Sequence, residues 1–311
     1  WETKEARKKE NNIGKTKILL EKPIFIDTLK TIGTYKDIGD SIGTFNYNYS
    51  VSSWFFIHNE PPSLRHANTK LADIHLVASE EAKTRVLKMG EDEDFVFNTG
   101  CPSIDIAYEV SRNPKLDFNP IDKYGGVGKK INWQDGYIVV MQHPVTTEYD
   151  QARENVYNTL KVVHELGIPA FWFWPNVDSG ADGTSNGIRS YREEHQPENI
   201  HFFKNMIPED FLRLLCNSKC LVGNSSVGIR ECAFLGVPVV NIGTRQHGRA
   251  RGKNVIDVSY EQDAIKNGIL NRIQTENRIA KDTIYGNGDS GKKIADILAT
   301  IELRYHKTIM Y

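Results

Sequence analysis

The chain of 311 residues has 39 Lys and Arg against 40 Asp and Glu, a formal net charge of −1, and 39% hydrophobic residues. This composition predicts a packed core and excludes wholesale disorder, and the length suits one large domain or two domains of about 150 residues each. The balanced charge predicts neither a nucleic-acid partner nor a membrane surface, and no apolar run reaches the ~18 residues that a membrane span needs.

The first half of the chain predicts few regular elements. Residues 1–56 give no clear pattern, and their charged start lacks the apolar core of a secretory signal. The apolar residues 74–78 predict a strand. Ser79 then predicts the cap of a helix, because Glu80 and Glu81 would occupy its first turn. Residues 113–136 are rich in Pro, Gly and Asp and predict a linker.

From Tyr137 onward, apolar runs alternate with amphipathic segments. The apolar runs predict strands over residues 137–141, 168–174, 199–204, 219–223 and 237–243. The amphipathic segments predict helices over residues 150–167, 208–218 and 225–236. Strands that are apolar on both faces and alternate with helices indicate an α/β fold, a parallel sheet with helices on both faces.

The start of the last predicted helix is a candidate anion site. Asn224, Ser225 and Ser226 follow a strand and begin the helix, whose first amides lack internal partners and lie at the positive end of the helix dipole. Helix starts of this kind bind phosphate. Gly223 permits the tight turn that such a site needs.

Charged residues farther along extend this candidate site to a whole nucleotide. Glu231, predicted on the same helix, suits the two hydroxyls of a ribose. Three arginines follow the next strand, where guanidinium groups can bridge phosphate oxygens: Arg245, Arg249 and Arg251. The alternative is that the serines merely cap a helix and the arginines form a solvated face. We favour anion binding, since capping does not explain three arginines and three glycines within one short loop.

Metal chemistry has little support in the sequence. The four cysteines, Cys101, Cys216, Cys220 and Cys232, show no zinc-ligand spacing. Buried thiols in a reducing compartment explain them best, so we expect a cytoplasmic protein without a bound metal.

Five motifs in order carry a family resemblance: "QHPVTTEYDQAREN", "WPNVDSGADG", "GNSSVGIRE", "GVPVVNIGTRQHGRARGKNVIDV" and "IYGNG". With "LRHANTKLADIHLVASEEAKTRVLKMGEDEDFVFNTGCPSID", they make residues 57–300 similar to the hydrolysing UDP-N-acetylglucosamine 2-epimerases of sialic-acid and legionaminic-acid pathways. The resemblance implies two Rossmann-like domains facing a cleft, as in the GT-B fold. The expected parts are a shortened N-terminal domain over 1–120, a UDP-binding domain over 121–290 and a helix over 291–311 that crosses back to the first domain.

The resemblance also implies a reaction and its residues. UDP leaves C1 while a base removes the C2 proton. Water then adds to the resulting glycal, and UDP and N-acetylmannosamine are released without metal or other cofactor. The partners implied are a UDP-sugar and copies of the chain in a homodimer or tetramer. The implied catalytic residues are His143, Glu60 and Arg65. The implied substrate-binding residues are Asn176, Asp178, Met206, Ser225, Ser226, Glu231, Arg245 and His66.

The chain departs from the family pattern near its start. The Gly-Thr-Arg and Gly-Asp-Arg loops of the first domain are absent, and Pro61 and Pro62 replace an Asp-Glu pair. Three explanations compete: a truncated or pieced-together start, a diverged active enzyme, or a UDP-sugar binder without turnover. A GT-B glycosyltransferase is a further alternative. The stretch "HPVTTEYDQAREN" stands where non-hydrolysing relatives carry a "HRREN"-like motif, which favours the hydrolysing branch.

Overall fold

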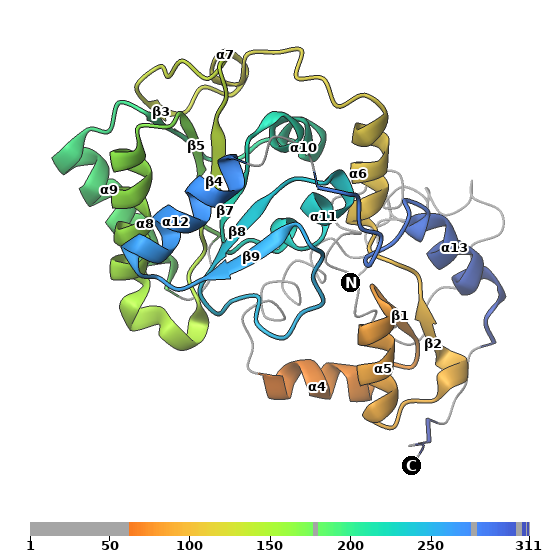
Figure 1. The fold of residues 1–311 in the computed structure, drawn as a ribbon. Helices are drawn as coiled ribbons and strands as arrows, with labels where there is room; N and C mark the ends of the chain where they lie inside the picture. The colour runs from red at the N-terminus through yellow and green to blue at the C-terminus, as the bar shows by residue number, and fades with distance from the viewer. Residues whose placement is uncertain (1–61, 177–179, 275–278, 303–306, 309, 311) are drawn as a thin grey trace, which may run out of the picture. The chain divides into compact units, whose positions relative to one another are not determined.

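The computed structural model describes residues 62–176, 180–274, 279–302, 307–308 and 310 (Figure 1). The chain divides into two compact units. Unit 1 combines the residues up to Pro102 with those from Ser290 onward, and unit 2 spans Ser103–Asp289. The domain boundaries expected from the sequence remain a prediction. Within the described ranges, every helix is too short or too polar to cross a bilayer.

The described part of unit 2 is built on one sheet of seven strands. Across the sheet they run in the order β3 (Val127–Gly128), β6 (Ile200–Phe203), β5 (Ala170–Phe173), β4 (Ile138–Met141), β7 (Leu221–Gly223), β8 (Val239–Ile242) and β9 (Val255–Val258). The strands from β4 to β9 are parallel, and β3 pairs antiparallel with β6 at one edge. The predicted α/β fold with a parallel sheet is therefore confirmed.

The order of the parallel strands identifies the kind of sheet. Numbered by their appearance in the chain, β4 to β9 lie in the order 3-2-1-4-5-6. This is the order of the doubly wound nucleotide-binding sheet, in which the chain reverses direction between the strands numbered 1 and 4. Here that switch point lies between β4 and β7, which are hydrogen-bonded neighbours.

Helices cover both faces of this sheet (Figure 1). On one side α8 packs against α9 and α12, and on the other α6, α10 and α11 pack together. The helices and short 3₁₀ turns of unit 2 are α6 (Ser103–Arg112), α7 (Pro120–Tyr124), η4 (Thr146–Gln151), α8 (Ala152–Leu166), α9 (Ala181–His195), α10 (Pro208–Asn217), η5 (Ser226–Gly228), α11 (Glu231–Leu235) and α12 (Gln262–Ile273).

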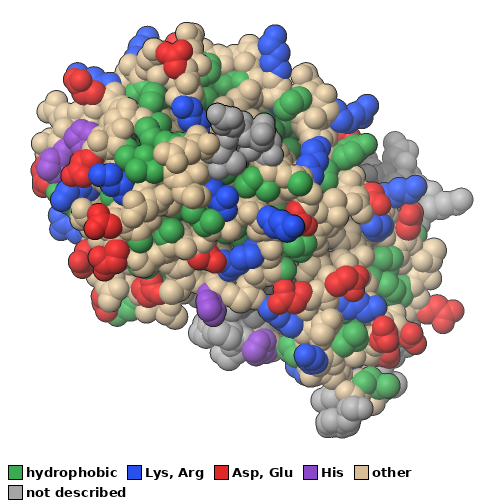
Figure 2. All heavy atoms as spheres, in the orientation of Figure 1, with side chains coloured by type: hydrophobic (Ala, Val, Ile, Leu, Met, Phe, Trp, Pro, Cys, Tyr) green, Lys and Arg blue, Asp and Glu red, His purple; other side chains and the backbone are tan. Residues whose placement is uncertain are grey.

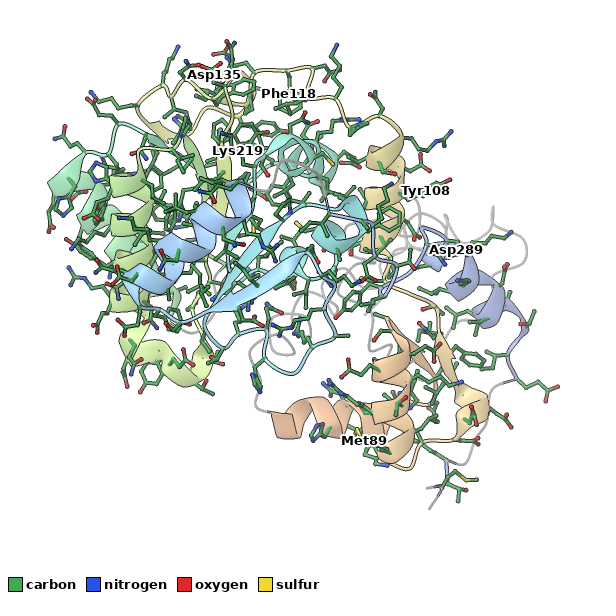
Figure 3. The ribbon with its side chains drawn as sticks, in the orientation of Figure 1. Met89, Tyr108, Phe118, Asp135, Lys219 and Asp289 are labelled. Atoms are coloured by element: carbon green, nitrogen blue, oxygen red, sulfur yellow. The ribbon has the colours of Figure 1, made fainter. Side chains whose placement is uncertain are left out.

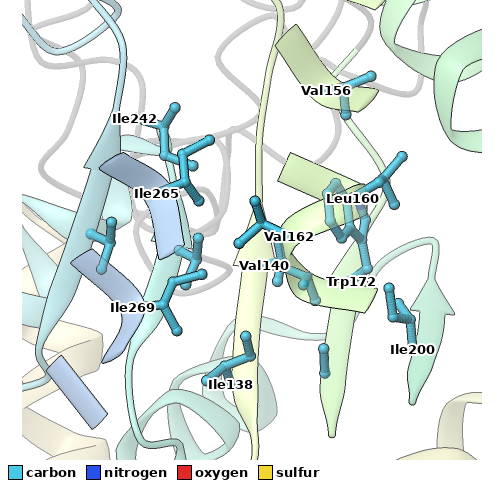
Figure 4. Packing of buried hydrophobic residues seen from close by; sticks show 14 of the residues in the cluster. Ile138, Val140, Val156, Leu160, Val162, Trp172, Ile200, Ile242, Ile265 and Ile269 are labelled. Carbon is cyan, nitrogen blue, oxygen red and sulfur yellow. The ribbon is translucent and has the colours of Figure 1, made fainter. Parts of the chain in front are cut away.

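Strand β5 shows why the central strands are continuously apolar. Its four residues are all buried. Trp172 joins the core that contains Leu160 of α8 (Figure 4). Phe173, on the other face of the strand, stacks edge-on with Phe211 of α10 at 4.9 Å between ring centroids. Successive strand residues point to opposite faces, so a strand covered on both sides buries every side chain.

The predicted linker over residues 113–136 is wrong in its middle part. It contains α7 and β3, and Asp210 in the first turn of α10 holds α7 in place. Lys123 Nζ lies 2.5 Å from the Asp210 carboxylate, and the Tyr124 hydroxyl donates to it at 2.6 Å. Pro and Gly mark turns in a sequence, but they do not distinguish a turn that packs on a domain from one that spans solvent.

Unit 1 contains a two-stranded parallel sheet among its described residues, with helices packed against it. Its elements are α4 (Pro62–Leu71), β1 (His75–Val77), α5 (Glu80–Lys88), η3 (Glu93–Phe95), β2 (Val96–Asn98) and α13 (Ser290–Thr300). The Ser79 hydroxyl accepts from the Ala82 amide at 3.2 Å, so the predicted cap of α5 is confirmed. On the face of the molecule in Figure 2, acidic and basic side chains are intermixed.

The late helix α13 belongs to the core of unit 1. Ile294 of α13 is buried together with Ile74 and Leu76, which come from residues more than two hundred positions earlier. Seven residues after α13 ends, Lys307 donates to three main-chain oxygens at the end of α4 at 2.5–3.1 Å. A lysine at this place caps the negative end of the helix dipole.

The same lysine takes part in a buried ionic cluster. The carboxylate of Glu91 is buried and lies 2.6 Å from Lys307, 3.1 Å from Lys70 and 2.9 Å from His75. Burial raises the pKa of Glu91, but the hydrogen bonds from Lys307, Lys70 and His75 outweigh it and hold the pKa below its ordinary value.

We predict that Glu91→Gln destabilises the protein at neutral pH by at most about 3–5 kcal/mol, because it removes the buried carboxylate that pairs with the partly exposed Lys70 and Lys307. A lowered folded-state pKa contributes stability above the unfolded pKa of ~4.3 and loses it as the pH falls through the folded pKa. The difference in melting temperature between wild type and variant should therefore shrink below pH ~4.3. Thermal unfolding from pH 7 to pH 3 measures it, with the exposed Glu193→Gln as control. A difference that stays constant with pH would contradict the assignment.

Candidate functional site

Predicted site residues lie together at the carboxyl ends of five neighbouring parallel strands of unit 2. In sheet order, the residues that follow β6, β5, β4, β7 and β8 are Met206, Asn176, His143, Ser225 with Ser226, and Arg245. Asp135 and Lys219 lie at the other end of these strands, before the amino ends of β4 and β7 (Figure 3). Doubly wound sheets bind ligands at the carboxyl edge, beside the switch point.

At the switch point, Asn224 binds the backbone of His143. The His143 amide donates to Asn224 Oδ1 at 2.7 Å, and Asn224 Nδ2 donates to the His143 carbonyl at 2.8 Å. The Asn224 amide also donates to the Met141 carbonyl at 3.1 Å, one step beyond the last paired residue of β7. Asn224 is fully buried. The sequence predicts an open phosphate contact for this residue, and the structure uses its side chain to join the ends of β4 and β7 instead.

The ring of His143 is oriented by the strand on its other side. The Asn176 amide, after β5, donates to His143 Nδ1 at 3.1 Å. Because Nδ1 accepts this hydrogen bond, the proton of the neutral imidazole is on Nε2. Nε2 is therefore the hydrogen-bond donor of the ring, and His143 is buried.

The loop after β8 is tied to the same asparagine through the main chain. The carbonyl of Asn224 accepts from Gln246 Nε2 at 2.7 Å and from Arg245 Nη1 at 3.3 Å. Arg251 is engaged differently: its guanidinium binds the Asp257 carboxylate and the Gln246 carbonyl. Of the predicted phosphate-binding arginines, Arg251 therefore has a structural role, and Arg245 lies beside the switch point.

A second link joins the loops after β4 and β8. Glu148 of η4 accepts from the Thr244 hydroxyl, and its other oxygen accepts from the Tyr260 hydroxyl at 3.2 Å. Burial and the neighbouring Glu148 carboxylate raise the pKa of Tyr260, so the hydroxyl keeps its proton and remains a donor. Gly243 makes room for this contact, because a Cβ there would lie 2.2 Å from the tyrosine ring.

The predicted helix over residues 225–236 is interrupted. Ser225 caps the 3₁₀ turn η5, and α11 begins at Glu231 after Arg230, whose backbone is not helical. The Arg230 guanidinium donates to the Ser226 hydroxyl at 3.2 Å. The prediction of one continuous helix is therefore wrong, and Glu231 stands at the start of a new helical turn rather than two turns along the first.

Glu231 has an unpaired oxygen in the interior of unit 2. Its Oε1 lies 3.5 Å from the Arg230 guanidinium, and its buried Oε2 has no hydrogen-bond partner among the described residues. A buried carboxylate oxygen without donors costs free energy. Such an atom is suited to accept hydrogen bonds from a ligand.

The remaining predicted residues divide into two groups. Met206 is buried, and its amide donates to Asn205 Oδ1 at 2.9 Å. Glu60 and Asp178 lie outside the described residues, and Arg65 and His66 belong to α4 of unit 1. Their roles remain predictions.

Comparison with known proteins decides the family. The family model described as UDP-N-acetylglucosamine 2-epimerase matches residues 62–299. The chain belongs to the UDP-N-acetylglucosamine 2-epimerase family. A relative from Neisseria meningitidis with that name is 34% identical over 239 residues, 76% of this chain and 60% of the relative. The UDP-N,N'-diacetylbacillosamine 2-epimerase (hydrolyzing) of Legionella pneumophila is 31% identical over 241 residues, 77% of this chain and 61% of that protein.

Solved structures of UDP-N-acetylglucosamine 2-epimerases share the fold. The Methanocaldococcus jannaschii enzyme, in complex with UDP-GlcNAc and UDP, superposes with a TM-score of 0.59 at 17% identity, over 75% of this chain and 63% of that one. The Neisseria meningitidis enzyme bound to UDP-GlcNAc gives 0.56 at 16% identity, over 82% and 67%. The chain spans about 60% of the length of the curated epimerases that it matches first.

Sequence reasoning missed the residues that hold this edge of the epimerase fold together. Gln246 and Glu148 lie inside quoted motifs, but the sequence assigns them no role, because their partners lie 22 and 96 positions away. Asn224 was visible beside the serines, but its partner His143 lies 81 positions earlier. For Asn224, its place directly after a strand of the parallel sheet is the signal that could have found its role.

Gly223 makes the close contact between β4 and β7 possible. Its φ is +128°, and a Cβ there would lie 2.2 Å from the Met141 carbonyl oxygen. We predict that Gly223→Ala costs clearly more than the about 1–2 kcal/mol of a left-handed alanine. Gly167→Ala is the matched control, because Gly167 has φ +64° and open space around its Cβ. Urea unfolding measures both, and equal losses of stability would contradict the close contact.

Proposed function

We propose that the chain is a hydrolysing 2-epimerase of UDP-N-acetylglucosamine or a related UDP-2-acetamido sugar. In the first step the C1–O bond to UDP breaks as a base takes the C2 proton, which gives a glycal. In the second step water adds its hydroxyl to C1 and C2 receives a proton on the opposite face. The products are UDP and the free C2 epimer, N-acetylmannosamine for the first substrate.

The contacts of Asn224 with His143 and Arg245, and of His143 with Asn176, at the switch point of a doubly wound sheet carry this proposal. Departure of UDP places negative charge on a diphosphate oxygen, and fixed donors lower the barrier where charge develops. The Nε2–H of His143 and the guanidinium of Arg245 are donors suited to that oxygen. The tautomer favours His143 as donor to the leaving group over His143 as base for C2.

The nucleoside end of the substrate is assigned to Glu231. Two vicinal ribose hydroxyls offer two donors, and the unpaired Oε2 of Glu231 accepts. Ser225 and Ser226 would lie along the diphosphate. In this structure the Ser225 hydroxyl accepts a hydrogen bond from the Val227 amide, and the Ser226 hydroxyl accepts one from the Arg230 guanidinium. The family resemblance makes Glu60 the candidate for proton transfer at C2. The homodimer or tetramer and the cytoplasmic location stay predictions.

Two observations support the hydrolysing branch. The stretch "HPVTTEYDQAREN" differs from the "HRREN"-like motif of non-hydrolysing relatives. The Legionella relative, 31% identical, is named a hydrolysing epimerase of a UDP-linked diacetamido sugar. The name of this relative also supports a UDP-2-acetamido sugar as the proposed substrate.

Incubation of the 311-residue chain with UDP-N-acetylglucosamine tests the reaction. We expect UDP and free N-acetylmannosamine in equal amounts, and incorporation of one solvent deuterium at C2 when the buffer is D₂O. His143→Ala should lose turnover by about 10²–10³-fold, as when a fixed donor to a developing oxyanion is removed, with a smaller loss of UDP affinity. Saturable UDP binding without turnover by wild type would favour a non-catalytic binder. UDP release that requires an acceptor sugar would favour a glycosyltransferase.

We predict that Glu231→Gln weakens UDP binding by about 1.5–3 kcal/mol, as for loss of a hydrogen bond to a charged group. The loss should disappear with 2',3'-dideoxy-UDP, which lacks the two hydroxyls that Glu231 is assigned to hold. Calorimetric titration of both ligands into wild type, Glu231→Gln and the control Glu193→Gln measures the effect. An equal loss for both ligands would place Glu231 away from the ribose.

A further inference from the structure

We infer that Asn224 is a positioning residue for His143, and that its side chain, not its main chain, performs this role. The inference rests on the proposed function for its meaning, since His143 is assigned there to the departing diphosphate. Its structural basis is independent of any substrate. It is the pair of hydrogen bonds of 2.7 and 2.8 Å that run in opposite directions between one side-chain amide and one backbone residue.

This pair requires a primary amide. Asn224 Oδ1 must accept from the His143 N–H while Nδ2 donates to the His143 carbonyl. A carboxylate of the same shape accepts but cannot donate, and an alanine does neither. Both residues are buried, so water cannot replace the lost partners without opening the site.

The two hydrogen bonds between the Asn224 side chain and the His143 backbone lie where the pairing of β4 with β7 ends. Gly223 is the last residue of β7 paired with β4, opposite Met141. Two residues beyond Met141, the Asn224 side chain supplies the two bonds that a further strand residue would have made to His143. His143 is thus held as if it were still in the sheet, although it already lies in a loop.

Holding the backbone of His143 fixes its ring. Asn176, on the β5 side of β4, donates its amide to Nδ1 at 3.1 Å, and Asn224 grips the backbone from the β7 side. The two contacts together set both the position of the imidazole and the tautomer with Nε2–H. If the backbone drifts, the Asn176 bond lengthens and the tautomer preference weakens.

The two functions of Asn224 can be separated. Arg245 and Gln246 bind its main-chain carbonyl, which every side-chain variant keeps. A change of the side chain should therefore disturb His143 and leave the Arg245 loop in place. We expect a lower kcat with little change in UDP affinity.

The experiment uses the whole 311-residue chain and four variants, of which His143→Ala serves only to assign the NMR signals. Asn224→Asp keeps the acceptor and loses the donor, and Asn224→Ala loses both. Asn199→Ala is the matched control, because Asn199 also makes two side-chain hydrogen bonds to main-chain carbonyls, at 2.9 and 3.0 Å. Asn199 lies before the amino end of β6, away from the carboxyl ends of the strands where His143 lies. Circular dichroism and UDP titration verify folding and nucleotide binding for each.

Nitrogen NMR of histidine-labelled protein reports the tautomer directly. Spectra are recorded about two units above the ordinary histidine pKa of ~6.5, and His143 is assigned by comparison with His143→Ala. Wild type and Asn199→Ala should show His143 with bare Nδ1 and protonated Nε2. Asn224→Ala should show mixed tautomers, with Asn224→Asp shifted in the same direction. Turnover by Asn224→Ala should fall about 100-fold, the cost of misplacing a reacting group by ~1 Å.

The outcomes separate this inference from the proposed function. If wild type does not turn over the substrate, the proposed function fails, and the NMR comparison still decides whether Asn224 sets the state of His143. A folded Asn224→Ala whose His143 keeps the wild-type tautomer signals would overturn the inference, whatever its kcat. Where Asn224→Ala does not fold, the isosteric Asn224→Asp provides the same test.

Discussion

The side-chain amide of Asn224, buried between the ends of β4 and β7, is the constraint on which the candidate site depends. A fully buried amide must satisfy its donor and its acceptor within the protein, and here both go to one residue. The main chain of Asn224 extends the same junction to the loop after β8. One residue therefore sets the relative positions of three loops that leave the sheet at its switch point.

The strand order explains why these loops converge. In the order 3-2-1-4-5-6, chain segments on the two sides of the switch point leave the sheet in opposite directions, and a crevice opens between them. β4 and β7 are the two strands beside it, and His143 and Asn224 follow closely after their ends. Glu148, after β4, adds a second link to these loops by accepting hydrogen bonds from Thr244, after β8, and from Tyr260.

Local patterns predicted much of the fold of unit 2. α8 was predicted because its apolar spacing and Gly167 are both visible in the sequence, and β5 because a strand covered on both faces is apolar throughout. β9 is short and half-buried, so it lacks that signature. The break before α11 arises at Arg230, whose side chain turns back to Ser226, and no helix propensity records such a contact. The strand-to-helix pattern led to Glu231 and Arg245, and the family motifs led to His143. The bonds that orient His143 join residues far apart in the chain and could not be read from any motif.

The core of unit 1 contains Ile294, and Lys307 closes its helix α4, although both follow the whole of unit 2 in the chain. During synthesis, a ribosome therefore delivers every residue of unit 2 before it delivers the last pieces of unit 1. Domains usually fold in the order in which they emerge. Here that order is reversed, because we expect unit 2 to fold before unit 1 is complete. Until α13 is synthesised, β1 and β2 expose the apolar face that Ile294 later covers. We expect chaperone binding to be strongest during this interval.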